Sequence, residues 1–293
     1  MKLVVSNFYS TIVRKASDYI VLLKFRLSML VVFSSVIGYL FGSKLSFDIY
    51  KLFFLALGGS LVTFSSNAIN QYIEKETDKL MLRTQNRPLP TNKLGGMEVI
   101  LFIGITAFSG LSILALVFNT TTALLSALSL LLYGFFYTPL KRISSIAVFV
   151  GAIPGALPPL LGYVAATNAL DQNAIWLFLV QFFWQFPHFW AIAWVSFDDY
   201  KRAGIMLLPS KDGKSKTSTV IILMYTLMLI PLSIYPFFQK NIGLIGASII
   251  LLSSVIFSFQ AFKLFRNAVD AEARKLMFYS FGYLLVFLIS LFL

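Results

Sequence analysis

Apolar stretches long enough to cross a membrane recur nine times along the 293-residue chain. A helix needs roughly 20 mainly apolar residues to span the hydrocarbon core of a bilayer. The nine stretches cover approximately residues 18–41, 48–70, 98–118, 121–138, 145–166, 174–197, 217–237, 242–262 and 274–293. The sequence therefore predicts an all-α integral membrane protein with nine transmembrane helices.

Composition excludes the other broad classes of protein. Hydrophobic residues make up 58% of the chain and charged residues only 12%, whereas about a quarter of a soluble domain is charged. The chain contains no Cys, which excludes a disulfide-stapled scaffold and a Cys-ligated zinc site. We expect a single transmembrane domain over residues 1–293.

Basic residues predict how the chain is oriented. With the N-terminus in the cytoplasm, 21 of the 24 Lys and Arg residues fall on the inner side, and only Lys44, Lys51 and Lys240 fall outside. An excess of Lys and Arg marks cytoplasmic loops. We therefore predict an outer C-terminus, two long cytoplasmic loops at about 71–97 and 198–216, and a bacterial-type cytoplasmic (inner) membrane. The net charge of +12 then reports topology rather than binding to nucleic acid.

The second apolar stretch ends in polar residues spaced to share one face of a helix, namely Asn67, Asn70, Glu74 and Asp78. Amides and carboxylates inside a span usually face a cavity, although amides also join neighbouring helices by hydrogen bonds. Carboxylates four residues apart can bind a hard divalent cation such as Mg²⁺ through oxygen. The stripe therefore favours a metal site over simple helix packing.

Two pairs of residues near this stripe suit a phosphate group. Arg83 and Arg87 lie four residues apart, and guanidinium groups bind phosphate oxygens in pairs. Tyr137 and Lys141 are also four apart, and both reach a phosphate if the chain stays helical past Pro139. Carboxylates that bind a metal, next to arginines that bind phosphate, are expected in an active site from which diphosphate leaves. The alternative interpretation is a solvated charged loop.

The sixth apolar stretch carries a second polar stripe. Gln181, Gln185 and His188 share one helical face, and His188 is the only histidine in the chain. A buried histidine is usually a structural hydrogen-bonding group, so that role and a substrate role both stay open. The loop that follows adds a second acidic pair, Asp198 and Asp199.

These residues resemble the motifs of the UbiA-type intramembrane prenyltransferase superfamily. The stripe at 70–78 is similar to its Asn-x3-Asp-x3-Asp motif, with Glu74 where Asp is usual, and Tyr137 and Lys141 match its Tyr-x3-Lys motif. Four segments resemble the haem-farnesylating branch of that superfamily, namely Lys24-x-Arg26, Gly155–Tyr163, Trp184–Ala191 and Asp199–Pro209. The resemblance extends over residues 20–210. The second acidic motif departs from the pattern, because its two aspartates are adjacent.

The resemblance implies a nine-helix bundle around a central cavity, with both acidic loops over its cytoplasmic mouth. It also implies an Mg²⁺-dependent enzyme that transfers the farnesyl group of farnesyl diphosphate to a vinyl group of haem B. Water is added, and the products are haem O, for the cofactor of haem-copper oxidases, and diphosphate. Haem B is then a substrate rather than a bound cofactor, and a haem A synthase or oxidase assembly proteins are the implied partners.

The motifs and the resemblance together assign roles to residues. The expected catalytic residues are Asp78, Asp199, Lys141 and Tyr137. The expected metal ligands are Asn70, Glu74, Asp78, Asp198 and Asp199. The expected substrate-binding residues are Asn67, Asn70, Arg83, Arg87, Lys24, Arg26, Gln185, His188 and Tyr200.

Two other functions fit part of the pattern. A superfamily member that prenylates the aromatic ring of a quinone precursor would share the first acidic motif, so only the segments of the sixth stretch argue against it. A small-molecule membrane transporter would also carry polar stripes in two spans. It would not need two acidic loops with arginines on one side of the membrane.

Overall fold

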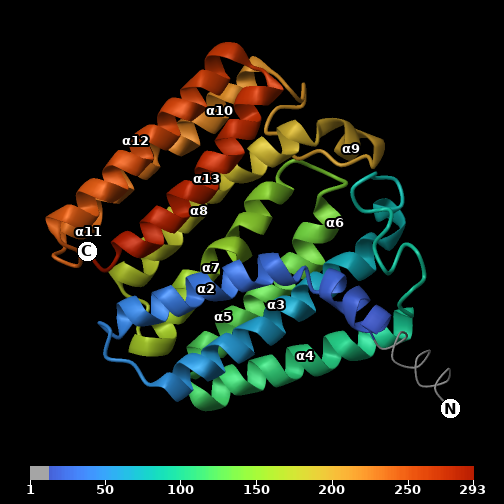
Figure 1. Cartoon of the computed structure of the whole chain (residues 1–293), viewed down its shortest axis with the longest axis horizontal. Coiled ribbons are helices and arrows are strands. Elements are labelled where there is room, and N and C mark those ends of the chain that lie inside the picture. The colour runs from blue at the N-terminus through green and yellow to red at the C-terminus, as the bar shows by residue number, and fades with distance from the viewer. Residues whose placement is uncertain (1–12) are drawn as a thin grey trace.

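A bundle of long helices makes up the part of the chain that the computed structural model describes, residues 13–293 (Figure 1). Nine helical segments in this part are long and apolar enough to cross a membrane. They are α2 (Phe25–Gly42), α3 (Ile49–Asp78), α4 (Gly96–Val117), α5 to α6 (Thr120–Leu140), α7 (Ala147–Thr167), α8 (Gln172–Val195), α10 to α11 (Lys216–Phe238), α12 (Leu244–Asn267) and α13 (Asp270–Ser290). The prediction of nine transmembrane helices is confirmed.

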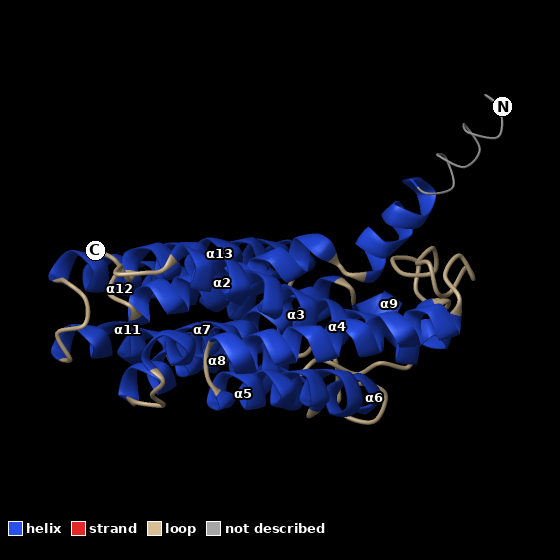
Figure 2. Ribbon diagram, turned by 90° about the horizontal axis from the view of Figure 1, so that it is seen from below, coloured by secondary structure: helices blue, strands red, loops and turns tan. Residues whose placement is uncertain are grey.

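The first predicted span is not one helix. Residues 13–22 are helical, and Figure 2 shows them leaving the bundle at an angle to the nearly parallel spans. The chain then turns at Lys24, whose backbone is left-handed with φ 46° and ψ 50°, and α2 begins at Phe25. The prediction of an unbroken helix over 18–41 was therefore wrong, because side chains of α3 bind the backbone carbonyls at the break.

The second span runs farther than its apolar stretch. The 30-residue helix α3 continues to Asp78, so its last two turns carry polar side chains beyond the predicted end at 70. Asp48 caps its start by accepting a hydrogen bond from the backbone N–H of Tyr50. Helix continuity is what keeps Asn70, Glu74 and Asp78 on one face.

The fourth span stays helical past its proline, with a local change of pitch. It consists of α5 (Thr120–Leu131), a π-helical turn η1 (Leu132–Tyr137) and α6 (Thr138–Leu140). The Thr138 hydroxyl donates to the carbonyl oxygen of Tyr133 at 2.8 Å. The backbone N–H of Lys141 still reaches the carbonyl oxygen of Tyr137 at 3.2 Å, so Lys141 follows Tyr137 by one helical turn.

Close packing of α2 on α7 fixes the centre of the bundle. A Cβ atom at Gly162 would collide with the carbonyl oxygen of Ser35, and one at Gly38 would collide with that of Pro159. Glycine is therefore required at both positions, and the small residues of α7 serve packing. The largest apolar core joins α7 and α8 to α10–α13, and it includes Trp176, whose indole N–H donates to the carbonyl oxygen of Leu232 at 2.8 Å.

Two loops far apart in the sequence meet at one end of the bundle, and the C-terminus lies at the other end (Figure 1). One loop covers residues 79–95, and the other follows the short helix α9 (Phe197–Arg202). Met81 packs against Ala203 and Ile205 across the two loops. The two loops predicted to share a side of the membrane therefore lie together, while the cytoplasmic identity of that side stays a prediction.

Candidate functional site

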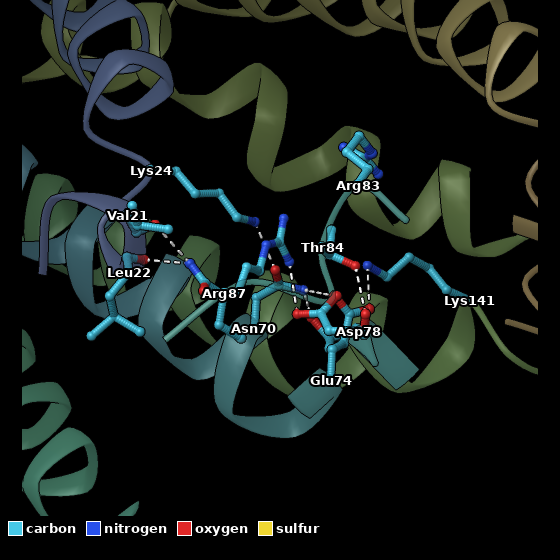
Figure 3. Close-up of polar contacts among 12 residues, drawn as sticks. Val21, Leu22, Lys24, Asn70, Glu74, Asp78, Arg83, Thr84, Arg87 and Lys141 are labelled. Atoms are coloured by element: carbon cyan, nitrogen blue, oxygen red, sulfur yellow. Dashed lines mark hydrogen bonds and ion pairs between the residues drawn. The ribbon is translucent and has the colours of Figure 1, made fainter. Parts of the chain in front are cut away.

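Two buried carboxylates on the last turns of α3 form the centre of the candidate site (Figure 3). Glu74 is 7% exposed and Asp78 is fully buried. The Nζ atom of Lys141 lies 2.5 Å from Oε1 of Glu74, and Nη1 of Arg87 lies 2.8 Å from Oδ2 of Asp78. Buried charges persist only when they are paired in this way. Four of the residues predicted from sequence thus converge.

Asn70 joins a further cation to this pair. Its Oδ1 accepts a hydrogen bond from Nζ of Lys24 at 2.7 Å, and its Nδ2 donates to Oε2 of Glu74 at 2.8 Å. The same Nδ2 also donates to the hydroxyl of Thr138 at 3.2 Å. Figure 3 shows Lys24 and Arg87 approaching from one side and Lys141 from the other. We call Lys24, Asn70, Glu74, Asp78, Arg87 and Lys141 the acid–base cluster.

Charge in the acid–base cluster is not balanced. Two carboxylates face the three cations Lys24, Arg87 and Lys141, so the cluster carries one excess positive charge when all are ionised. Burial, together with the neighbouring Arg87 and Lys141 charges, lowers the pKa of Lys24, which lies one residue before α2, to about 7. An anion bound beside these cations would favour the charged form of Lys24. The cluster therefore favours an anionic ligand.

The oxygen atoms of the cluster fit a hard divalent cation. Oδ1 of Asp78 is buried and has no hydrogen-bond partner among residues 13–293. Within that range no three His, Asp or Glu side chains gather closely enough to hold a metal ion alone. Mg²⁺ is usually bound by one or two carboxylates and completed by waters and substrate phosphates, so an incomplete protein set suits it. The residues that would hold it are Asp78, Glu74 and the amide oxygen of Asn70.

Two tyrosine rings lie beside the cations. The rings of Tyr133 and Tyr137 are 5.3 Å apart between centroids, on consecutive turns of η1. Nζ of Lys141 lies 4.7 Å from the centroid of Tyr137, and Nζ of Lys24 lies 6.0 Å from that of Tyr133. Aromatic faces attract cations. A hollow of about 310 Å³ borders Glu74, Thr77 and Thr138 close by.

Several predicted residues lie outside the acid–base cluster. Arg83 turns away from it in Figure 3 and donates from Nη2 to the Tyr200 hydroxyl at 3.3 Å. Asp199 pairs with Arg202 and accepts a hydrogen bond from the backbone N–H of Leu82 at 3.4 Å. Asp198 is exposed on α9. The second acidic pair thus lies over the first loop without reaching the buried carboxylates.

Two further predicted residues near the first span differ in surroundings. Arg26 is exposed on the first turn of α2. Asn67 is 3% exposed, and its Nδ2 donates to the carbonyl oxygen of Leu23 at 3.2 Å and to the Ser28 hydroxyl at 2.9 Å. Its contacts are with the break in the first predicted span rather than with the acid–base cluster.

The polar side chains of α8 form hydrogen bonds with two neighbouring helices. Nε2 of Gln185 donates to the carbonyl oxygen of Ala152 on α7 at 2.6 Å. Nδ1 of His188 lies 2.7 Å from the hydroxyl of Ser280 on α13, and its ring stacks on Trp184 at 4.9 Å. Neither side chain contacts the acid–base cluster.

Four residues around the site had no role in the sequence prediction. Thr84 donates to the carbonyl oxygen of Asp78, and Thr138 accepts from Asn70. Gln71 donates to the backbone before α2, and Ser280 binds His188. Gln71 follows Asn67 by four residues, so the helical spacing that selected the stripe would also have selected it. Thr84 binds the chain six residues earlier, where α3 has ended, and Thr138 and Ser280 make contacts across the fold. Spacing along one helix reports neither kind of contact.

Comparisons with known proteins agree with this architecture. A model of the UbiA prenyltransferase family matches residues 31–282. The protoheme IX farnesyltransferase of Cytophaga hutchinsonii is 45% identical over 266 residues, which cover 91% of this chain and 93% of that protein. The protoheme IX farnesyltransferase of Flavobacterium psychrophilum is 43% identical over 274 residues, covering 92% of this chain and 91% of that protein.

Solved structures share the fold. A digeranylgeranylglyceryl phosphate synthase superposes with a TM-score of 0.80 at 21% identity, covering 95% of this chain and 98% of that one. A UbiA homologue from Archaeoglobus fulgidus bound to DMAPP and Mg²⁺ has a TM-score of 0.68 at 16% identity, covering 91% and 98%. Because the family model spans most of the chain and the relatives match over nearly their full length, this integral membrane protein belongs to the UbiA prenyltransferase family.

Proposed function

We propose that this chain transfers the farnesyl group of farnesyl diphosphate to a vinyl group of haem B, with addition of water, to form haem O and diphosphate. The relatives that are 45% and 43% identical are protoheme IX farnesyltransferases, and each is matched over more than nine-tenths of its length. The observation that carries the chemistry is the acid–base cluster, in which buried carboxylates and three cations meet at one end of the bundle.

The acid–base cluster suits a magnesium diphosphate because its ion pairs can exchange partners. Glu74 and Asp78 are paired with Lys141 and Arg87 in this structure. With Mg²⁺ held by the two carboxylates, Lys141 and Arg87 would be free to donate to phosphate oxygens. Lys24 would join them if Asn70 gave its amide oxygen to the metal. Bound Mg²⁺ neutralises the diphosphate and makes it a better leaving group. The related Archaeoglobus fulgidus structures hold Mg²⁺ together with DMAPP or GPP.

The residues of the cluster would act most strongly as the diphosphate departs. The bond between the allylic carbon and oxygen breaks, and diphosphate takes the electron pair. Lys141, Arg87 and Lys24 stabilise the negative charge that develops on it, because fixed donors in a buried site need no reorganisation. The faces of Tyr133 and Tyr137 flank the same space and suit the allylic cation left behind. The vinyl group of haem then donates its π electrons to that cation, and water captures the new cation with loss of a proton.

Phe189 and Trp190, in the segment Trp184–Ala191, are alternative aromatic residues for sheltering the allylic cation. Trp190 is fully buried and packs on Phe186 and Tyr225, and Phe189 is 40% exposed. The tyrosines of η1 therefore replace them in the proposal. The cytoplasmic orientation of the site, and an association with a haem A synthase or oxidase assembly proteins, rest on the positive-inside bias and on the proposed product.

A reconstitution experiment tests the proposal. Purified protein in detergent or vesicles is supplied with haem B, farnesyl diphosphate and Mg²⁺, and the haem product is identified by mass. A hydroxyethylfarnesyl haem is expected, and EDTA should prevent its formation. A parallel reaction with 4-hydroxybenzoate replaces haem B. A prenylated ring in that reaction, with no haem product in the first, would overturn haem as the acceptor.

A further inference from the structure

The amides of α3 make a set of hydrogen bonds that the proposed reaction does not use. Nε2 of Gln71 donates to the carbonyl oxygens of Val21 and Leu22, at 3.0 and 2.7 Å. Nδ2 of Asn67 donates to the carbonyl oxygen of Leu23 at 3.2 Å. These carbonyls belong to the last turn of the helical segment 13–22 and to the break that follows it.

The hydrogen bonds from α3 explain how the chain can break where it packs against buried amide side chains. The last carbonyls of a helix lose their partners within the helix, and without water they need other donors. Gln71 is fully buried and Asn67 is 3% exposed, so both amides act inside the protein. The Ser28 hydroxyl adds a further hydrogen bond to the carbonyl oxygen of Leu23 at 2.7 Å.

The break has a consequence for Lys24. A left-handed backbone is unfavourable for a residue with a Cβ atom, so surrounding contacts must hold it. The backbone of Lys24 is tied on both sides, because its N–H reaches the carbonyl oxygen of Val21 at 3.1 Å and its carbonyl accepts from Ser28 N–H at 3.0 Å. Its side chain then reaches Asn70, one position before Gln71.

One turn of α3 therefore binds four consecutive residues that precede α2. Residues 67, 70 and 71 lie on one helical face, and they contact residues 21–24. The contacts fix both where the first helix stops and where the Lys24 ammonium group lies. Continuation of a helix through residue 24 would direct that side chain elsewhere.

We infer that Gln71 and Asn67 are positioning residues, which hold the break at residues 23–24 and thereby deliver Lys24 to the diphosphate end of the substrate. Asn67 then acts on the substrate through Lys24, in place of the direct contact expected from sequence. This inference rests on the proposed function only in requiring that the acid–base cluster binds a diphosphate. Haem plays no part in it.

A double-mutant cycle tests the inference. Gln71→Met keeps the length of the side chain and removes its N–H donors, and Lys24→Ala removes the delivered ammonium group. Binding of magnesium diphosphate and of farnesyl diphosphate to the full-length protein is measured calorimetrically for wild type, both single variants and the double variant. Each single variant should weaken binding roughly tenfold or more, as for the loss of a hydrogen bond to a charged group.

The double variant decides between the two roles. If Gln71 acts through Lys24, the double variant binds no more weakly than Lys24→Ala alone. If Gln71 only joins helices, either Gln71→Met binds diphosphate normally or the losses of affinity in the two single variants multiply in the double variant. Either result overturns the inference. The matched control is Gln260→Met, since Gln260 is also buried and, within residues 13–293, its side chain donates hydrogen bonds to Glu272 on α13. It should lose stability without weakening diphosphate binding.

If the Gln71→Met variant fails to fold, a second measurement tests the same inference. Lys24→Cys introduces the only thiol in this Cys-free chain, and Mg²⁺ with inorganic diphosphate should slow its alkylation. Ser28→Ala, a milder change at the same break, should reduce that protection severalfold if the break delivers residue 24 to the site. Unchanged protection would overturn the inference. Failure of wild type to bind diphosphate would instead overturn the proposed function.

Discussion

The ammonium nitrogen of Lys141 lies 2.5 Å from Oε1 of Glu74, and both side chains are about nine-tenths buried. The pair joins the end of the fourth span to the end of the second. The other carboxylate oxygen of Glu74, Oε2, accepts a hydrogen bond from Asn70, so each oxygen of this carboxylate has one partner. A divalent cation that binds Glu74 would compete with Lys141 for the same negative charge, and the ion pair is therefore expected to weaken when the ligand enters.

Glu74 variants test this competition. Glu74→Ala leaves Lys141 buried without its partner, and we expect a loss of roughly 3 kcal/mol in the free energy of unfolding as well as of prenyl transfer. Glu74→Asp keeps the charge and restores the residue usual in the family motif, so it should be tolerated far better. Thermal unfolding in detergent and kcat/KM for farnesyl diphosphate measure the two effects. Equal activity of the two variants would show that the carboxylate of Glu74 does not serve the reaction.

Asp78 variants test the metal. Asp78→Ala should lower prenyl transfer roughly 100-fold or more, because the diphosphate is left poorly neutralised. Asp78→Asn keeps the side-chain volume and a hydrogen-bond acceptor for Arg87, so a similar loss there would assign the effect to charge. Activity is measured against Mg²⁺ concentration. Glu98→Gln is the control, since Glu98 pairs with Lys15 and Tyr19 away from the cluster. Near-wild-type turnover of Asp78→Ala would remove this residue from the mechanism.

Local pattern explains why the spans and the carboxylate face were predictable. Length and hydropathy alone define nine segments, and the 3.6-residue period puts Asn70, Glu74 and Asp78 on one face. The break at Lys24 was not predictable in this way, because its stability comes from Gln71 and Asn67 on another helix. A left-handed lysine carries no local sequence signal.

Contacts across the fold also explain why some predicted site residues lie outside the acid–base cluster. Arg83 and Arg87 are four residues apart, yet the chain between them is not a regular helix, and the two guanidinium groups bind Tyr200 and Asp78 respectively. The last three spans carried no functional motif in the sequence. One of them, α13, nevertheless supplies Ser280 to His188. Residues from distant segments meet only after packing, which periodicity in a single segment does not describe.

The orientation of the bundle is tested by labelling single cysteines in this Cys-free chain. Thr91 lies exposed in the first long loop and Lys211 in the second. Cysteines at Thr91 and Lys211 should react only with reagent on the cytoplasmic side, because both loops lie on the basic side of the protein. Ser46→Cys, at the other end, should react only from outside. Labelling of either loop from outside would contradict the predicted topology.

His188 is the residue whose role the structure sharpens most. The Ser280 hydroxyl donates its hydrogen to the carbonyl oxygen of Met277 at 2.5 Å, so its oxygen accepts a hydrogen bond from Nδ1–H of His188. In the neutral imidazole Nε2 is then the unprotonated nitrogen, and no hydrogen bond joins it to residues 13–293. If this nitrogen positions haem B, His188→Ala should weaken haem binding and haem O formation while farnesyl diphosphate binding stays nearly intact, because the acid–base cluster is separate.

If the role of His188 is purely structural, His188→Ala should instead lower the stability of the protein and weaken the binding of both substrates together. Separate titrations of the two substrates, with the haem absorption spectrum recorded for wild type, His188→Ala and Ser280→Ala, distinguish these outcomes. Ser280→Ala should cause a smaller change of the same kind, because it frees the ring without removing Nε2. Normal haem binding and haem O formation by His188→Ala would show that this histidine does not position haem.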